Sequence, residues 1–237
     1  MTTYVLIPGA GCDPWYWHLV VPLLRERGHD VVAADLPCED ESAGLAAYTE
    51  AVLDAIGDRT DLVVVAHSLG GFTAPLVCER VPVDLMVLVA AMVPAPGESP
   101  GEWWDNTGLS GARREAEAAA GRDPDAPFDP DVAFLHDVPK ELAAELMAEH
   151  SRNQADAPFL KPWPLRSWPQ VPTRFLLCRH DRFLPAAFQR RVVRERLGFT
   201  PDEMDSGHLP SLSRPQDLVD RLEAYRLGLG AGLTAGS

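Results

Sequence analysis

The sequence lacks the features of a membrane protein or a nucleic-acid-binding protein. Its apolar runs are far too short to span a bilayer, and the first of them, near residues 3–7, has neither the length nor the preceding basic residues of a signal peptide. Lysine and arginine number 21 against 35 acidic residues, which gives a formal net charge of −14. Because an acidic surface repels phosphates, we expect a soluble cytoplasmic monomer or homodimer that acts on a small molecule and binds neither nucleic acid nor membrane.

Cysteine is scarce and its spacing follows no recognised pattern. The chain has four cysteines, and no C-x-x-C pair or Cys/His cluster with zinc-site spacing is present: Cys12, Cys38, Cys78 and Cys178. Scattered cysteines of this kind indicate reduced thiols, so neither a disulfide framework nor a metal is expected. Cys12 lies beside a glycine-rich turn and is a candidate for the substrate pocket, with a small apolar packing role as the alternative.

Short β-rich runs alternate with helical segments in two parts of the chain. The runs lack the polar-apolar alternation of a half-exposed sheet, which is typical of parallel strands buried on both faces. They cover residues 3–7, 31–34, 62–66, 85–90 and 174–178. Helical segments cover residues 15–27, 43–56, 69–80, 185–197 and 215–227. This order predicts an α/β fold with a doubly wound, mostly parallel sheet.

Residues 94–171 interrupt the alternation. Proline, glycine and charged residues dominate there, with helical patches at 112–120 and 140–151 and an unusual share of the aromatic residues. We therefore divide the chain into a core of residues 1–93 and 172–227, a helical cap insertion of residues 94–171, and a flexible Gly/Ala tail of residues 228–237. A second small domain or a partly disordered loop is the alternative for the insertion.

Ser68 is the candidate nucleophile. It follows a valine-rich run in the string AHSLGGF, at the junction of a buried strand and a helix. A nucleophile on such a tight turn needs small neighbours two residues away on each side, and Ala66 and Gly70 supply them. Gly71 lets helix and strand approach closely, and the helix N-terminus favours developing negative charge. These features predict a nucleophile elbow.

An acyl-transfer enzyme also needs two backbone N–H groups that stabilise the oxyanion. Leu69, directly after the candidate nucleophile, would supply one. The loop after the first strand would supply the other, from Ala10 or alternatively from Gly11 or Cys12. A dinucleotide-binding loop is disfavoured, because Pro14 stands where its third glycine belongs.

The general base and its carboxylate partner follow in the chain order serine, acid, histidine. His208 is the only histidine after residue 180, and it lies in a turn before the last helical segment. Asp181 lies just past the end of a buried strand, so it is the candidate acid. Asp205 is the alternative acid.

The other histidines have less specific roles. His180 is expected to be an exposed neighbour of the acid, and His67 a packing residue beside the nucleophile. His136 would face either the substrate or the surface. The candidate pocket residues are Gly11, Cys12, Trp103, Trp104, Phe128, Phe134, His136, Phe183 and Leu209.

Three regions of the sequence resemble the α/β-hydrolase family, and more narrowly its branch of plant methylesterases and hydroxynitrile lyases. The matching strings are PGAGCDPWYWHLVVPLLRERGHDV, AHSLGGF, and CRHDRFLPAAFQRR followed by GHLPSLSRPQDLVDRL. The resemblance implies six strands, without the first two of the full fold, and a pocket between sheet and cap. The chain departs from the branch at Pro8, where histidine is common, and at Ala66. Leu209 replaces the lysine of the lyases, which disfavours cyanohydrin cleavage.

These inferences predict a serine esterase that forms an acyl-enzyme without a cofactor. The net acidity and the apolar cap predict a small or medium, largely apolar and uncharged ester. One alternative uses the same triad as a lactonase, C–C hydrolase, lyase or cyclase in a biosynthetic pathway. Another is a non-catalytic ligand-binding protein of the same fold.

Overall fold

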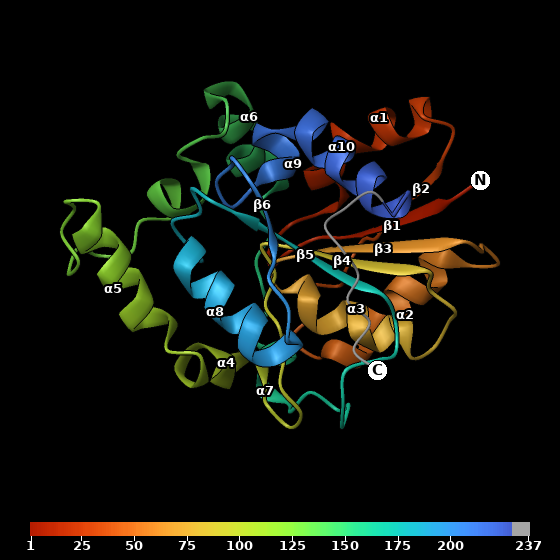
Figure 1. Cartoon of the computed structure of the whole chain (residues 1–237), viewed down its shortest axis with the longest axis horizontal. Coiled ribbons are helices and arrows are strands. Elements are labelled where there is room, and N and C mark those ends of the chain that lie inside the picture. The colour runs from red at the N-terminus through yellow and green to blue at the C-terminus, as the bar shows by residue number, and fades with distance from the viewer. Residues whose placement is uncertain (229–237) are drawn as a thin grey trace.

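The chain folds around one six-stranded sheet in which every pairing is parallel (Figure 1). The structure is a computed structural model, and it describes residues 1–228. The strands lie in the order β2-β1-β3-β4-β5-β6. Their bounds are β1 Thr3–Ile7, β2 Asp30–Ala33, β3 Leu62–His67, β4 Leu85–Val89, β5 Thr173–Cys178 and β6 Asp202–Met204. The predicted fold class and strand number are confirmed.

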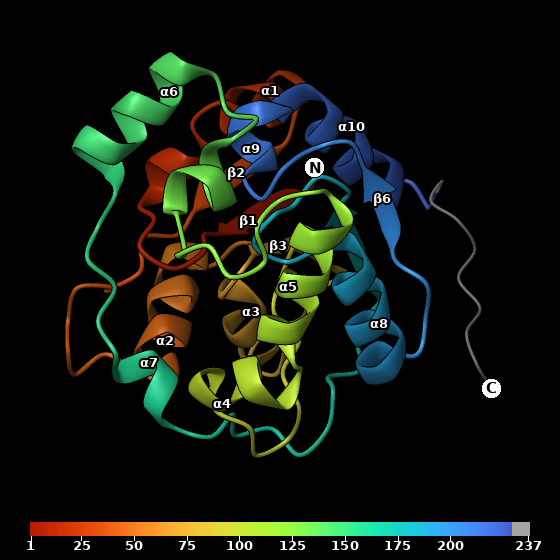
Figure 2. The same cartoon turned by 90° about the vertical axis from the view of Figure 1, so that its left-hand side faces the viewer.

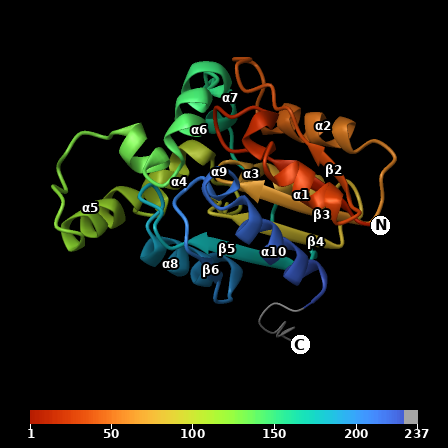
Figure 3. The same ribbon diagram turned by 90° about the horizontal axis from the view of Figure 1, so that it is seen from above.

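Helices cover both faces of the sheet, as Figures 1 and 3 show. On one face lie α1 (Val20–Glu26) and α10 (Pro215–Arg226), and on the other lie α2 (Leu45–Ile56), α3 (Gly70–Cys78) and α8 (Ala186–Leu197). Successive strand residues point to opposite faces, so Val64 packs in one cluster and Val63 in the other. Both clusters exclude water, which explains why the strands show no alternation.

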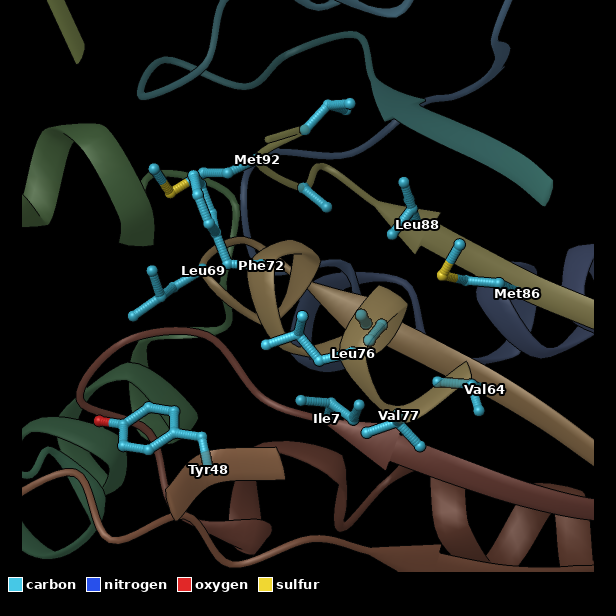
Figure 4. Close-up of a cluster of buried hydrophobic side chains, with 14 of the residues drawn as sticks. Ile7, Tyr48, Val64, Leu69, Phe72, Leu76, Val77, Met86, Leu88 and Met92 are labelled. Carbon is cyan, nitrogen blue, oxygen red and sulfur yellow. The ribbon is translucent and has the colours of Figure 1, made fainter. Parts of the chain in front are cut away.

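Figure 4 shows how one face of the sheet holds the helix that follows the candidate nucleophile. Ile7 of β1 and Leu88 of β4, the strands on either side of β3, pack with Leu76 and Val77 of α3 in one buried cluster. Full burial of such side chains contributes roughly 1.5–3 kcal/mol each. The position of α3, and therefore of the turn before it, is fixed by this core.

Two predicted helices are divided in the structure. The segment predicted over 15–27 consists of η1 (Pro14–Trp17) and α1, and Asp13 caps the first of them through its side chain and the Trp15 N–H. The segment predicted over 140–151 consists of α6 (Lys140–Glu145) and η3 (Leu146–His150). Proline at position 14 favours a short first turn, because its fixed φ suits the start of a helix.

Residues 94–171 contribute no strand, since β4 ends at Val89 and β5 begins at Thr173. They contain α4 (Pro100–Asn106), α5 (Leu109–Ala119), η2 (Asp131–Leu135), α6, η3 and α7 (Ala157–Leu160). Figures 1 and 2 show α4, α5 and α6 beyond the end of the sheet toward which the strands point. Two buried tryptophans attach the segment to the core: the Trp103 indole donates to the Val93 carbonyl at 2.9 Å and that of Trp163 to Phe72 at 3.1 Å.

No helix within residues 1–228 has the length and apolar character needed to cross a membrane. A four-residue helix, α9 (Pro210–Ser213), connects the turn that carries His208 to α10. The predicted flexible tail lies outside the described residues, apart from Gly228.

Candidate active site

Ser68 occupies a strained turn between β3 and α3. Its φ angle is 51°, a left-handed value that non-glycine residues rarely adopt. Close packing holds the turn, because a Cβ on Gly71 would lie 2.0 Å from the Met92 carbonyl oxygen and one on Gly70 would lie 3.0 Å from that of Pro8. Position 71 therefore accepts only glycine, and position 70 leaves very little room for a side chain. The predicted tight strand-to-helix turn is therefore present, and Ala66 is buried near the end of β3.

Ser68, His208 and Asp181 lie in one chain of hydrogen bonds. The Ser68 Oγ is 3.2 Å from His208 Nε2, and His208 Nδ1 is 2.7 Å from Asp181 Oδ2. All three residues are buried, with exposed fractions of 7%, 2% and 5%. A low local dielectric strengthens these polar contacts and makes an unpaired member costly. The three residues come from three different strand ends and meet at one edge of the sheet.

The Asp181 carboxylate is held on the side away from His208. Its Oδ1 accepts hydrogen bonds from the backbone N–H groups of Phe183 and Leu184, each at 2.8 Å. The Gln189 amide donates to Oδ2 at 3.3 Å. These donors fix the orientation of the carboxylate toward the imidazole.

The alternative acid lies elsewhere. Asp205 accepts a hydrogen bond from Arg179 at 2.9 Å and lies 3.7 Å from the largely exposed His180 imidazole. Its carboxylate is exposed to solvent and has no hydrogen bond to His208. Its nearness in sequence to His208 does not bring the two side chains together, because the turn directs them apart.

Two backbone N–H groups are free beside the candidate nucleophile. Among the hydrogen bonds of residues 1–228, the amides of Ala10 and Leu69 have no protein acceptor. The Gly11 N–H instead donates to Gln154 Oε1 at 3.1 Å, which occupies one of the alternative donors. A Cβ on Gly9 would lie 3.0 Å from that of Ser68, so the loop after β1 packs directly on the elbow. This arrangement suits the predicted pair of oxyanion donors.

His67 is a packing and positioning residue in the strand before Ser68. Its ring stacks on Tyr16 with centroids 4.7 Å apart, and its Nε2 lies 2.8 Å from the His208 carbonyl oxygen. Complete burial holds the pKa of His67 well below the ordinary histidine value, and the nearby His208 adds to this shift. A neutral His67 therefore donates its Nε2–H to the turn that carries His208.

Phenylalanine rings surround the His208 imidazole. The centroids of Phe134 and Phe183 lie 5.3 and 5.1 Å from that of His208. Phe128 and Trp104 extend the aromatic cluster on the far side of Phe183, at 6.1 and 5.8 Å. Four of the predicted pocket residues thus form one apolar group that begins at the candidate base.

The other predicted pocket residues have different surroundings, although the Trp103 ring contacts the aromatic group through Trp104, with centroids 5.4 Å apart. Trp103 and Leu209 are almost fully buried in the two core clusters, so they pack within the protein. Cys12 forms an isolated β-bridge with Ser151, and burial raises the pKa of its thiol to about 12, so it stays protonated at neutral pH. The bridge next to Gly11 connects the loop after β1 to η3.

Two adjacent residues of the insertion contact the turns that carry the candidate acid and the candidate base. The sequence analysis named only His136, the first of the two. His136 Nε2 lies 2.9 Å from the carbonyl oxygen of His180, just before Asp181. The Asp137 carboxylate accepts from the Gly207 N–H at 2.6 Å, just before His208. Asp137 had no motif to reveal it, because its partner lies 70 positions away.

Replacing Asp137 with alanine is expected to destabilise the turn that carries His208. A hydrogen bond to a charged group contributes about 1.5–3 kcal/mol, so we expect the free energy of unfolding to fall by about that amount and kcat to decrease. Denaturant titration and steady-state ester hydrolysis measure the two effects. Asp137→Asn should retain most of both quantities, because its amide oxygen still accepts from Gly207. Asp131→Ala, an exposed carboxylate of the same segment, is the control, and an equal loss in it would contradict the assignment.

A strained serine on an elbow after a central parallel strand, with a histidine and a carboxylate from later strand ends, defines the class of α/β hydrolases. The comparison with known families agrees. The model of the alpha/beta hydrolase family matches residues 4–221, and the chain belongs to that family.

Several characterised proteins are similar over nearly their whole length. Methylesterase 3 of Arabidopsis thaliana is 26% identical over 246 residues, which cover 90% of this chain and 92% of that protein. Norfluorocurarine synthase 2 of a Strychnos species is 27% identical over 250 residues, covering 92% and 93% of the two chains. A probable esterase of Oryza sativa subsp. japonica is 27% identical over 252 residues, covering 92% and 94%.

Solved structures share the same architecture. Polyneuridine aldehyde esterase superposes with a TM-score of 0.76 at 21% identity, over 95% of this chain and 99% of that one. A pyrethroid hydrolase from Sphingobium faniae JZ-2 superposes with a TM-score of 0.75 at 24% identity, over 95% and 97%. At these identities the likeness establishes the fold.

Proposed function

We propose that this protein is a serine esterase that cleaves a small or medium, largely apolar carboxylic ester through an acyl-enzyme. The prediction of a carboxylic ester hydrolase is confirmed by the methylesterase and esterase relatives. The observation that carries the mechanistic part is the chain of hydrogen bonds through Ser68, His208 and Asp181.

In the first half of the reaction, Ser68 Oγ attacks the ester carbonyl carbon while His208 Nε2 takes its proton. The carbonyl oxygen becomes an oxyanion, which the N–H groups of Leu69 and Ala10 stabilise. The tetrahedral intermediate collapses, and the alkoxide leaves with the proton that the imidazolium returns. Asp181 keeps its charge throughout, since it orients Nδ1–H and stabilises the imidazolium.

In the second half, water attacks the acyl-enzyme carbonyl and His208 takes a proton from that water. Collapse of the second intermediate returns the proton to Ser68 Oγ and releases the carboxylic acid. The balance is one ester and one water converted to one acid and one alcohol, so no cofactor is required. A donor pair of this kind typically lowers the barrier by several kcal/mol, about 10²–10³ in rate for each donor.

We further propose that residues 94–171 form a cap that closes the pocket. Support comes from their position beyond the strand ends in Figure 2, and from the contacts of Phe134 and Asp137 with the His208 ring and turn. The four cysteines are all free, which suits a reducing compartment such as the cytoplasm.

The test is intact-mass analysis after exposure to a fluorophosphonate probe, together with hydrolysis of short-chain 4-nitrophenyl esters. We expect a single adduct on the wild type and none on Ser68→Ala or His208→Ala, with ester turnover by the wild type alone. An adduct without turnover would favour a biosynthetic step such as lactone opening, C–C cleavage, elimination or cyclisation, an alternative that the relative named as a synthase supports. The absence of any adduct would contradict the proposal and favour a ligand-binding protein.

A further inference from the structure

A large cavity lies beside the aromatic cluster, between α5 and the segment that contains η2. Its volume is about 780 Å³. Four arginine side chains line it, Arg113, Arg114, Arg122 and Arg182, along with Phe128 and Glu117. Such a concentration of guanidinium groups is unexpected in a chain whose formal net charge is −14.

Two of the four arginines are neutralised by carboxylates of the same segment. Arg114 forms an ion pair with Asp125. Arg122 forms a bidentate ion pair with Glu117, in which Arg122 Nη2 donates to Glu117 Oε1 at 2.9 Å. The other acidic side chains of the lining, Asp123 and Asp129, accept hydrogen bonds from backbone N–H groups two residues ahead and so stabilise turns.

Arg113 and Arg182 have no such partner. Within residues 1–228, neither guanidinium makes a hydrogen bond or an ion pair with a carboxylate, and Glu117 attracts both only from a distance. Arg182 is half-buried next to Asp181 in sequence. Partly buried guanidinium groups with no carboxylate partner leave N–H donors available at the cavity, and an anionic ligand could pair with them.

The aromatic surroundings of Arg113 suit the binding of an anion. Its guanidinium lies 4.6 Å from the Phe128 ring centroid and 5.7 Å from that of Phe183. A cation held against the ring faces is attracted by their π-electrons, and this attraction uses none of its N–H donors for a conventional hydrogen bond. Burial lowers the pKa of Arg113 from its very high ordinary value, and the attraction of Glu117 and Asp181 opposes that shift. The group remains a cation at neutral pH.

One aromatic ring connects this cavity to the candidate base. Phe183 contacts Arg113 on one side and the His208 imidazole on the other, where the ring centroids are 5.1 Å apart. An ester whose carbonyl reaches Ser68 and whose apolar body follows the aromatic cluster would therefore extend toward the two free arginines.

We propose that Arg113 and Arg182 form a subsite for an anionic group, a carboxylate at the end of the substrate away from the scissile ester. This inference rests on the proposed function and narrows the substrate class to esters with an apolar or aromatic body and one remote negative charge. It departs from the uncharged substrate expected from net charge, because the sign of the whole surface does not decide the sign of one cavity.

The test compares two series of 4-nitrophenyl esters: monoesters of straight-chain dicarboxylic acids with five to ten carbons, and the neutral alkanoates of equal length. We expect the wild type to prefer the anionic ester at the chain length that reaches the cavity, and the preference in kcat/KM to fall about 10- to 100-fold in Arg113→Gln and in Arg182→Gln. The fall should appear mainly in KM and the preference should weaken with added salt. Arg113→Lys should restore part of it.

Arg114→Gln is the matched control, since it removes a neighbouring arginine of the same helix and cavity that already has a partner. Equal preference in the wild type and both glutamine variants, or a wild type that favours the neutral ester at every length, would overturn the inference. Hydrolysis of the neutral alkanoates reports folding and the proposed function separately. If those esters are cleaved and Ser68 is labelled while no anion preference exists, only the subsite is wrong.

Discussion

Ser68→Ala and His208→Ala are each expected to lower kcat for a 4-nitrophenyl ester by about 10⁴–10⁶, and the double variant to fall no further than the lower single variant. The reason is that the two side chains act together in one step, in which the imidazole takes the hydroxyl proton as the serine oxygen attacks. Without the imidazole, 3.2 Å away, the Ser68 hydroxyl keeps its proton and is a weak nucleophile; without the hydroxyl, the imidazole has nothing to activate except water. The residual rate comes from substrate binding and the oxyanion donors.

Steady-state kinetics of the wild type, both single variants and the double variant measure this coupling. Ser206→Ala and His180→Ala are the matched controls, since each removes a like side chain next to a triad turn and neither group contacts Ser68. Losses that multiply in the double variant would show that the two residues act independently, and a single variant with near wild-type kcat would remove that residue from the mechanism.

The core of the fold was predictable because local chemistry decides it. Valine-rich runs such as residues 62–66 cannot be half exposed, and their alternation with helical segments leaves few topologies. The sequence pattern did not locate β6, because this strand has only three residues, two of them acidic, and lies at the edge of the sheet. Its Glu203 is stabilised there by Arg190 and Arg179, contacts that no local pattern reveals.

The candidate triad could be proposed from the sequence for a different reason: each member must follow a strand end in a fixed order, so the topology limits the candidates. The packing of residues 94–171 was not predictable, because these residues find partners far along the chain. The hydrogen bond from the Gly207 N–H to Asp137 and the separation of paired from unpaired arginines both depend on how residues 94–171 fold over the sheet. The periodicity of apolar residues can predict helices in such a segment, but it does not predict how those helices pack.

Asp181→Asn is expected to lower kcat by about 10⁴ with little change in fold. The two backbone N–H groups of Phe183 and Leu184 require an acceptor, so the asparagine would place its oxygen there, and its NH₂ group would face His208. An NH₂ donor at 2.7 Å from Nδ1 forces that nitrogen to accept, and the ring proton moves to Nε2. Nε2–H then points at Ser68 Oγ and cannot take its proton, so labelling by the fluorophosphonate should slow in parallel with turnover.

Asp205→Asn separates this tautomer effect from a general loss of negative charge near the site. Its carboxylate pairs with Arg179 in solvent, so its replacement should change kcat less than twofold, in line with the small contribution of exposed ion pairs. Thermal unfolding of both variants completes the comparison. A large loss of kcat in Asp205→Asn together with a small loss in Asp181→Asn would identify Asp205 as the acid that partners His208. Equal losses of kcat would indicate that both carboxylates act through the electrostatic field at His208 and not through the position of its proton.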